Sequence, residues 1–165
     1  MVEASASEPS VATPVGFRRA MRRLASGVGI VTVIGPDGPA GLVATSITSL
    51  AMDPASLLVC VNRQASLHAC LVPGARFCVN LLSVRQRRVA EAFGGAVARA
   101  QRFTVGDWTR DAYGVPALES AQASISCQVD RLIAYGTHTI VIGQVGEVRL
   151  AGEVEPLIYQ DGLYL

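Results

Sequence analysis

Short segments of β-branched and apolar residues recur along this chain of 165 residues, and turn-forming residues separate them. Such segments are typical of β-strands, because branched side chains pack well on a pleated sheet. The segments that we predict as strands are 29–35, 42–54, 56–62, 75–82, 121–136 and 137–150, and residues 155–165 are expected to close the chain with a short strand and a turn. This pattern predicts a mainly β fold, an antiparallel barrel decorated by a few α-helices. Closing a sheet into a barrel also removes its unpaired edges.

Helical spacing of apolar residues predicts three helices, and one stretch has no regular pattern. The helices are expected at 15–27, 66–71 and 83–93, and residues 94–118 are expected to form a long loop or lid. Residues 1–14 are rich in Ser, Ala, Pro and Glu, which predicts a disordered leader. They lack the basic start and apolar core of a signal peptide. We therefore expect a single domain over residues 15–165.

The chain is unusually apolar for a soluble monomer. Charged residues make up 16% of it and hydrophobic residues 50%. No apolar run approaches the roughly 20 residues needed to span a bilayer, so we expect no membrane span. The net charge of +1 gives no basic field for nucleic acid. The remaining way to cover so much apolar surface is oligomerisation.

Several catalytic classes are excluded by missing motifs. The sequence has no GxGxxG after a strand, no GxSxG, no P-loop and no HExxH, and it contains only two histidines. We therefore expect no metal site, and any chemistry has to come from a bound group. All 14 basic residues are Arg, so any cation that binds an anion is a guanidinium. The four cysteines lack CxxC spacing, which indicates reduced thiols in a cytoplasmic protein.

Hydroxyl groups are concentrated in one predicted strand. Thr45, Ser46, Thr48 and Ser49 surround Ile47. On a continuous strand their side chains alternate between the two faces. A buried hydroxyl without a partner costs about 1–3 kcal/mol, so these groups need hydrogen-bond partners from the sheet itself or from a ligand.

The order of motifs from Phe17 to Leu165 resembles the short-chain flavin reductase family. The segments that carry this resemblance are ATSITSLAMDPASLLVCVNRQASLHACL, GARFCVNLL, VRQRRVAEAFG, RFTVGDWTRDAYGVPALESAQASISCQV, YGTHTIVIGQVGEV and EPLIYQDGLYL. The resemblance implies a split β-barrel of the FMN-binding type that forms a homodimer. It also implies that NADH or NADPH reduces FMN or FAD by hydride transfer to flavin N5. The reduced flavin would then serve a separate monooxygenase.

The resemblance also implies site residues. For the flavin these are Thr45, Ser46, Ile47, Thr48, Ser49, Asn62, Arg63, Ser66, Phe77 and Asn80. For the nicotinamide they are His138, Tyr159, Asp161 and Gly162, with His138 as the catalytic candidate. His138 matches the histidine of the family's Gly-Asp-His turn, although Thr137 stands here in place of the acidic residue.

Alternatives remain at this point. The acceptor of the electrons could be a corrinoid or a ferric complex, or the barrel could bind flavin or haem without turnover. Each candidate also has a structural interpretation: the hydroxyls satisfied by their own sheet, Ser66 as a helix cap, and Phe77 and Asn80 as ordinary core residues.

Overall fold

The computed structural model describes residues 13–165, so most of the leader predicted at 1–14 lies outside the described residues. The helical elements are α1 (Pro14–Met21), η1 (His68–Cys70), η2 (Val84–Gln86), α2 (Arg87–Glu91), η3 (Ala92–Ala96) and η4 (Arg99–Thr104). The strands are β1 (Ser26–Gly27), β2 (Gly29–Gly35), β3 (Gly38–Ala44), β4 (Ile47–Met52), β5 (Ala55–Asn62), β6 (Arg76–Leu81), β7 (Trp108–Arg110), β8 (Pro116–Leu118), β9 (Ala123–Tyr135), β10 (His138–Leu150), β11 (Ile158–Gln160) and β12 (Leu163–Tyr164). None of the described helices is long and apolar enough to cross a membrane.

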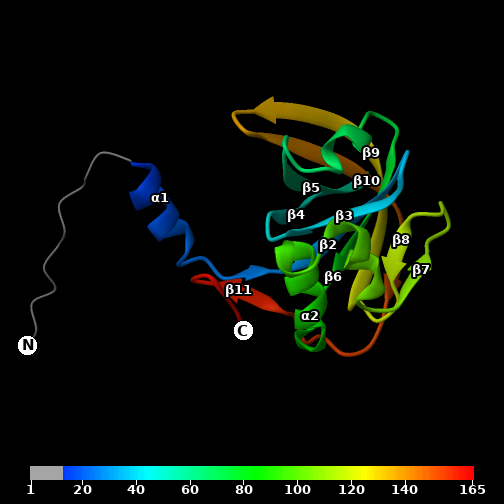
Figure 1. Cartoon of the computed structure of the whole chain (residues 1–165). Coiled ribbons are helices and arrows are strands. Elements are labelled where there is room, and N and C mark those ends of the chain that lie inside the picture. The colour runs from blue at the N-terminus through cyan, green and yellow to red at the C-terminus, as the bar shows by residue number, and fades with distance from the viewer. Residues whose placement is uncertain (1–12) are drawn as a thin grey trace, which may run out of the picture.

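Seven strands form one antiparallel sheet in the order β3-β2-β6-β9-β10-β5-β4. The strands at its two edges, β3 and β4, are joined only by Thr45 and Ser46. The sheet therefore has to curl until its edges come close, and Figure 1 shows its strands wrapped around a common interior. Two small sheets, β1-β11-β12 and β7-β8, lie beside it. The predicted mainly β, antiparallel split barrel is confirmed.

Two large apolar clusters and a small third one, formed by Cys78, Val115 and Ala117, fill the described part of the fold. The first lies inside the barrel and contains Val31, Val59, Val61, Phe77, Val79 and Val141. The second joins the sheet to α2 and η3 and contains Ile30, Leu82, Val89, Phe93 and Leu118. Inside the barrel the ring of Phe77 occupies the space where a side chain at Gly143 would stand. That close approach coincides with a register shift in β10 between Ile142 and Gly143.

Helix α1 stands apart from the barrel (Figure 1). The Thr13 hydroxyl caps its first turn by accepting a hydrogen bond from the Gly16 amide at 3.0 Å. No residue of α1 is buried. Its apolar residues Phe17 and Met21, and Leu24 shortly after it, are exposed to solvent, with 66% of Phe17 accessible. The helix therefore presents an apolar face that nothing in the described chain covers.

Several sequence predictions differ from the fold, among them the helix expected at 66–71, which is only the short turn η1. The helix expected at 83–93 is divided into η2, the single turn of α2 and the π-helical η3. The irregular lid expected at 94–118 is wrong, because this stretch contains η4 and the β7-β8 hairpin. The rings of Phe93, Phe103 and Trp108 pack together with centroids 5.0–5.4 Å apart and hold the stretch on the barrel.

All four cysteines are free, as the sequence predicts. Cys78 and Cys127 are buried, and burial raises the pKa of each thiol to about 12. These two thiols therefore stay protonated at neutral pH and behave as small apolar side chains. Cys60 and Cys70 are half-buried.

Asn80 is fully buried and joins its own strand, β6, to three others. Its amide nitrogen donates to the Ile30 carbonyl at 3.1 Å. Its amide oxygen accepts from the Leu118 amide at 2.8 Å and from the Ser124 hydroxyl at 3.0 Å. Each of these partners is itself buried, so losing Asn80 leaves unpaired polar groups inside the protein.

Replacing Asn80 by Ala is expected to lower the free energy of unfolding by about 2–4 kcal/mol, because buried partners lose their hydrogen bonds. Asn62→Ala is the matched control, since Asn62 is exposed and its side chain serves only the nearby Gln64 amide. Asn62→Ala should lower the free energy of unfolding by less than about 1 kcal/mol. Equilibrium urea unfolding measures both variants, and equal losses would contradict the role assigned to Asn80.

Candidate functional site

The hydroxyl-rich segment is a bend between two strands. β3 ends at Ala44 and β4 begins at Ile47, so the prediction of one continuous strand is wrong. At the bend the Ser46 hydroxyl donates to the Cys60 carbonyl at 3.1 Å and accepts from the Cys60 amide at 3.2 Å. The side chain of Ser46 thereby continues the pairing with β5 where the backbone of β4 has not yet begun.

The other hydroxyls of the segment remain available. Thr45, Thr48 and Ser49 are exposed. Within residues 13–165 the structure gives no hydrogen bond to any of their hydroxyl groups. Ser46 is therefore satisfied by its own sheet, and its three neighbours are free to bind a ligand.

A cleft of about 720 Å³ opens beside this bend. One wall is formed by Thr45, Ser46, Ile47 and Thr48, and another by Tyr159, Gln160, Asp161 and Gly162. The end of α1 and the following residues close a third side. The structure thus brings four of the predicted flavin residues together with the three residues of the predicted nicotinamide turn. Ser49 lies in the adjoining apolar cleft instead.

The C-terminal turn at this cleft is held in a defined conformation. Asp161 and Gly162 both have positive φ, at 49° and 88°. The Asp161 amide donates to the Arg22 carbonyl at 3.0 Å, and its carboxylate lies 3.9 Å from the Arg22 guanidinium. The centroids of the Tyr159 and Tyr164 rings lie 5.2 Å apart. Burial raises the pKa of the Tyr164 hydroxyl. These contacts fix the turn against the segment that follows α1.

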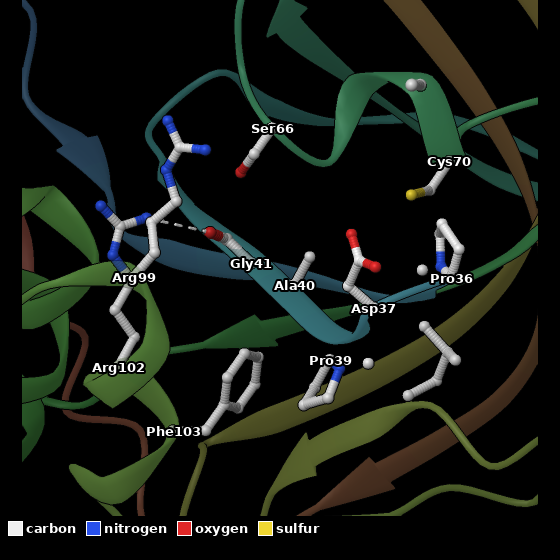
Figure 2. A pocket seen from close by; sticks show the side chains of 14 residues that line it. Pro36, Asp37, Pro39, Ala40, Gly41, Ser66, Cys70, Arg99, Arg102 and Phe103 are labelled. Carbon is white, nitrogen blue, oxygen red and sulfur yellow. Dashed lines mark hydrogen bonds between the residues drawn. The ribbon is translucent and has the colours of Figure 1, made fainter.

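A second cleft, of about 550 Å³, lies farther along β3 (Figure 2). Its lining includes the β2-β3 hairpin, Ser66, Arg99, Arg102 and Phe103. Ser66 was predicted from the sequence, whereas Arg99 and Arg102 were not. The only signal for these two arginines was the absence of lysine, which assigns every anion-binding cation to Arg. Their position became evident only once η4 was placed against β3.

His138, Asn62 and Arg63 form a third group at the start of β10. His138 lies opposite Asn62 in the β5-β10 ladder, and the Arg63 amide donates to the Thr137 carbonyl at 3.0 Å. The Thr137 hydroxyl lies 2.8 Å from His138 Nδ1. All of these residues are exposed, and none of them lines the cleft at the bend. The structure therefore does not bring His138 to the C-terminal turn within one chain.

Phe77 and Asn80 require a correction. Both side chains are 0% exposed and face the interior, so neither lines a cleft. Phe77 packs over Gly143 inside the barrel, whereas the side chain of Asn80 lies on the other face of β6 and bonds to β2, β8 and β9. Their predicted contact with a flavin is replaced by a role in packing and strand pairing. In the described part of the chain no group of three or more His, Cys, Asp or Glu side chains is arranged to hold a metal.

Comparison with known proteins gives one consistent result. The model for the flavin reductase like domain matches residues 21–165. The FMN reductase (NADH) RutF of Variovorax paradoxus (strain S110) is 38% identical over 160 residues, which cover 94% of this chain and 89% of that protein. The reductase component of the FADH(2)-dependent resorcinol hydroxylase of Rhizobium sp. (strain MTP-10005) is 38% identical over 150 residues, 90% of this chain and 84% of that protein.

A solved structure is similar as well. It is the NADH:FAD oxidoreductase SgcE6 of Streptomyces globisporus C-1027, in complex with NAD and FAD fragments. It has a TM-score of 0.85 and 29% sequence identity, and the match covers 95% of this chain and 96% of that chain.

Measurements of stability can distinguish Ser46, whose hydroxyl pairs with the sheet, from Thr48, whose hydroxyl is free to bind a ligand. Ser46→Ala should lower the free energy of unfolding by about 1–3 kcal/mol, because the Cys60 backbone groups lose their partner. Thr48→Ala should change it by less than about 0.5 kcal/mol, since Thr48 is exposed. Chemical denaturation of both variants is the measurement. A neutral Ser46→Ala would show that the hydroxyl does not contribute to strand pairing.

Proposed function

The chain belongs to the family defined by the flavin reductase like domain, and we propose that it uses NADH to reduce FMN for a separate flavin-dependent oxygenase. Relatives named FMN reductase (NADH) support the choice of NADH and FMN. A relative that is the reductase component of a hydroxylase supports the proposal of a separate oxygenase. The observation that carries the proposal is the cleft at the bend, where the hydroxyl segment faces the C-terminal turn.

The chemistry of this cleft fits an isoalloxazine ring. The ring has polar atoms along one edge and two apolar faces. Thr45 and Thr48 offer hydroxyls without a partner in the described chain, and Ile47 between them offers an apolar surface. A bound flavin supplies N5 as the acceptor of a hydride. Thr45 and Thr48 would bind the polar edge of the ring, where their hydroxyls would stabilise the negative charge that reduction adds to it.

The nicotinamide side is assigned to Tyr159, Asp161 and Gly162, which line the same cleft. Hydride transfer depends mainly on the positions of the two reacting atoms, so the fixed turn serves to orient the dinucleotide. We include His138 as a residue that positions the dinucleotide, with Asn62 and Arg63 beside it at the end of β5. Its exposed imidazole is accessible to a ligand.

The activity is tested by mixing the purified full-length protein with NADH and FMN and following the loss of NADH absorbance under controlled oxygen. We expect turnover that requires both substrates. FAD, riboflavin and NADPH are compared under the same conditions. Absence of NADH oxidation with every flavin would refute the proposed function.

The same assay tests His138. His138→Ala should lower kcat/KM for NADH by about tenfold to a hundredfold, because misplacement of reacting atoms by about 1 Å has that effect. The affinity for FMN, measured by fluorescence titration, should stay unchanged. An unaltered kcat/KM would make His138 a residue without a role in the reaction.

We further propose that the protein is a homodimer. The apolar cleft lined by Ile47, Met52, Leu57, Val145 and Val148 is open to solvent. Met52 is 84% exposed and Leu150 at the end of β10 is 79% exposed. This apolar face adjoins the cleft at the bend, because both are lined by Gly27 and Ile47. A second copy covering the face would remove this surface from water and close one side of the active cleft.

Light scattering should therefore give about twice the chain mass of 17.3 kDa. Replacing Met52 and Val148 together by Glu should yield a monomer, because charges cannot be buried unpaired at an apolar interface. Val154→Glu is the control, since Val154 is 90% exposed and does not line this face. A monomeric wild-type protein at micromolar concentration would contradict the dimer.

A further inference from the structure

The turn between β9 and β10, which we call the His138 turn (residues 136–138), is held by few contacts. Every residue from Ile133 to His138 is exposed, and Gly136 has a positive φ of 54°. Within residues 13–165 the one hydrogen bond of the His138 imidazole stays inside the turn, at the Thr137 hydroxyl. The first buried residue after the turn is Thr139, which is 5% exposed. The position of His138 therefore depends on what holds its neighbour Thr139.

His68 contacts Thr139 from a different part of the chain. The His68 Nε2 lies 2.9 Å from the Thr139 hydroxyl oxygen, which is the distance of a well-formed hydrogen bond. Among the described residues this hydroxyl has no other hydrogen-bond partner. A buried hydroxyl needs such a partner, whereas a valine at the same position would fill the same volume without one. We infer that the hydroxyl at position 139 serves to bind His68.

His68 is itself fixed by the barrel core. It is the first residue of η1, and Leu67 before it and Leu71 after it are 0% and 3% exposed and belong to the apolar cluster inside the barrel. Its amide donates to the Ala65 carbonyl at 2.9 Å, and its carbonyl accepts from the Leu71 amide at 3.1 Å. The half-buried imidazole of His68 thus extends from a rigid support toward Thr139.

The loop that contains His68 meets the His138 turn at a second point. The Arg63 amide donates to the Thr137 carbonyl at 3.0 Å. Both of these residues are exposed, so water competes for this hydrogen bond and the contact opens easily. The bond between His68 and Thr139 lies deeper, because Thr139 is buried. It is therefore the contact that holds the start of β10 when the exposed contact opens.

We propose that His68 is a positioning residue for the transfer of hydride from the dinucleotide. By binding Thr139 it fixes the start of β10, and with it the imidazole of His138 one residue earlier. The inference rests on the proposed function, because it takes His138 to position the dinucleotide. His68 does not line the cleft at the bend, so it acts on the reaction through His138. Loss of the bond displaces the imidazole, and small displacements of groups that orient the reactants slow the transfer.

The test measures kcat/KM for NADH and, separately, the Kd for FMN. His68→Ala should lower kcat/KM for NADH by about threefold to thirtyfold, because one hydrogen bond is lost, and leave the Kd for FMN within about twofold. Thr139→Val removes the same bond from the other side at nearly constant volume and should have the same effect. His68→Gln should keep kcat/KM within about twofold of the wild type, since the amide nitrogen of Gln takes the place of the imidazole Nε2.

Double-mutant cycles show whether His68 acts through Thr139 and His138. His68→Ala combined with Thr139→Val should lower kcat/KM no more than either change alone. In a His138→Ala protein, His68→Ala should have no further effect, whereas a merely structural role would lower the remaining activity as well. Multiplied effects, an equal loss of FMN affinity, or an unchanged kcat/KM after His68→Ala would overturn the proposal.

Gln64→Ala is the matched control, because Gln64 lies in the same loop, is exposed, and has a side chain without a hydrogen bond to the described residues. It should leave both kcat/KM and Kd within about twofold. Circular dichroism and thermal unfolding verify that the variants are folded, and Thr139→Val carries the test if His68→Ala does not fold.

Nuclear magnetic resonance tests the same link without a substrate. The amide signals of Thr137 and His138 should shift in His68→Ala and stay near their wild-type positions in His68→Gln. Unchanged signals in His68→Ala would overturn the proposal. Failure of the wild type to reduce any flavin would instead refute the proposed function, and the amide signals would still show whether His68 fixes the turn.

Discussion

The two-residue connection between the edge strands is the constraint on which the rest of the structure depends. A seven-stranded sheet that stayed open would separate β3 from β4 by the full width of the sheet. Thr45 and Ser46 cannot span that width, so the sheet has to roll up. The pairing of Ser46 with both backbone groups of Cys60 stabilises the closure at this point. Because Ser46 alone uses its hydroxyl within the sheet, Thr45 and Thr48 beside it are left on the surface and face a cleft. Closure of the fold and exposure of binding groups therefore come from the same short segment.

The strands were largely predictable from the sequence, because β-branched runs between turn residues leave little alternative. Residues 29–35 form a strand with the predicted bounds, and 137–150 differs from β10 by a single residue. The break at Thr45 was not predictable, since hydroxyl residues fit both a strand and a bend. The β7-β8 hairpin was also missed, because it is held on the barrel by Trp108, which packs on Phe103 and on Phe93 from the helical segment before it. Local patterns do not contain such contacts.

The candidate site was predictable in part, and the resemblance to a family carried most of it. The resemblance pointed to residues of the bend and of the C-terminal turn, which the structure places at one cleft. It failed for Phe77 and Asn80, because β6 lies in the middle of the sheet and its residues 77–80 are all buried. Alternation cannot show which side of such a strand faces a ligand. Arg99 and Arg102 lie in a stretch without periodicity, so only the folded arrangement relates them to Ser66.

The packing of Phe77 over Gly143 has a consequence for how such chains diverge. The ring of one residue fills the volume that a side chain on the other would need. A larger residue at position 143 is thus acceptable only in a lineage that has already accepted a smaller one at position 77. The two positions lie on strands that are not neighbours in the sheet. In a set of diverged sequences they should vary as a pair, and a change at either one alone should be rare.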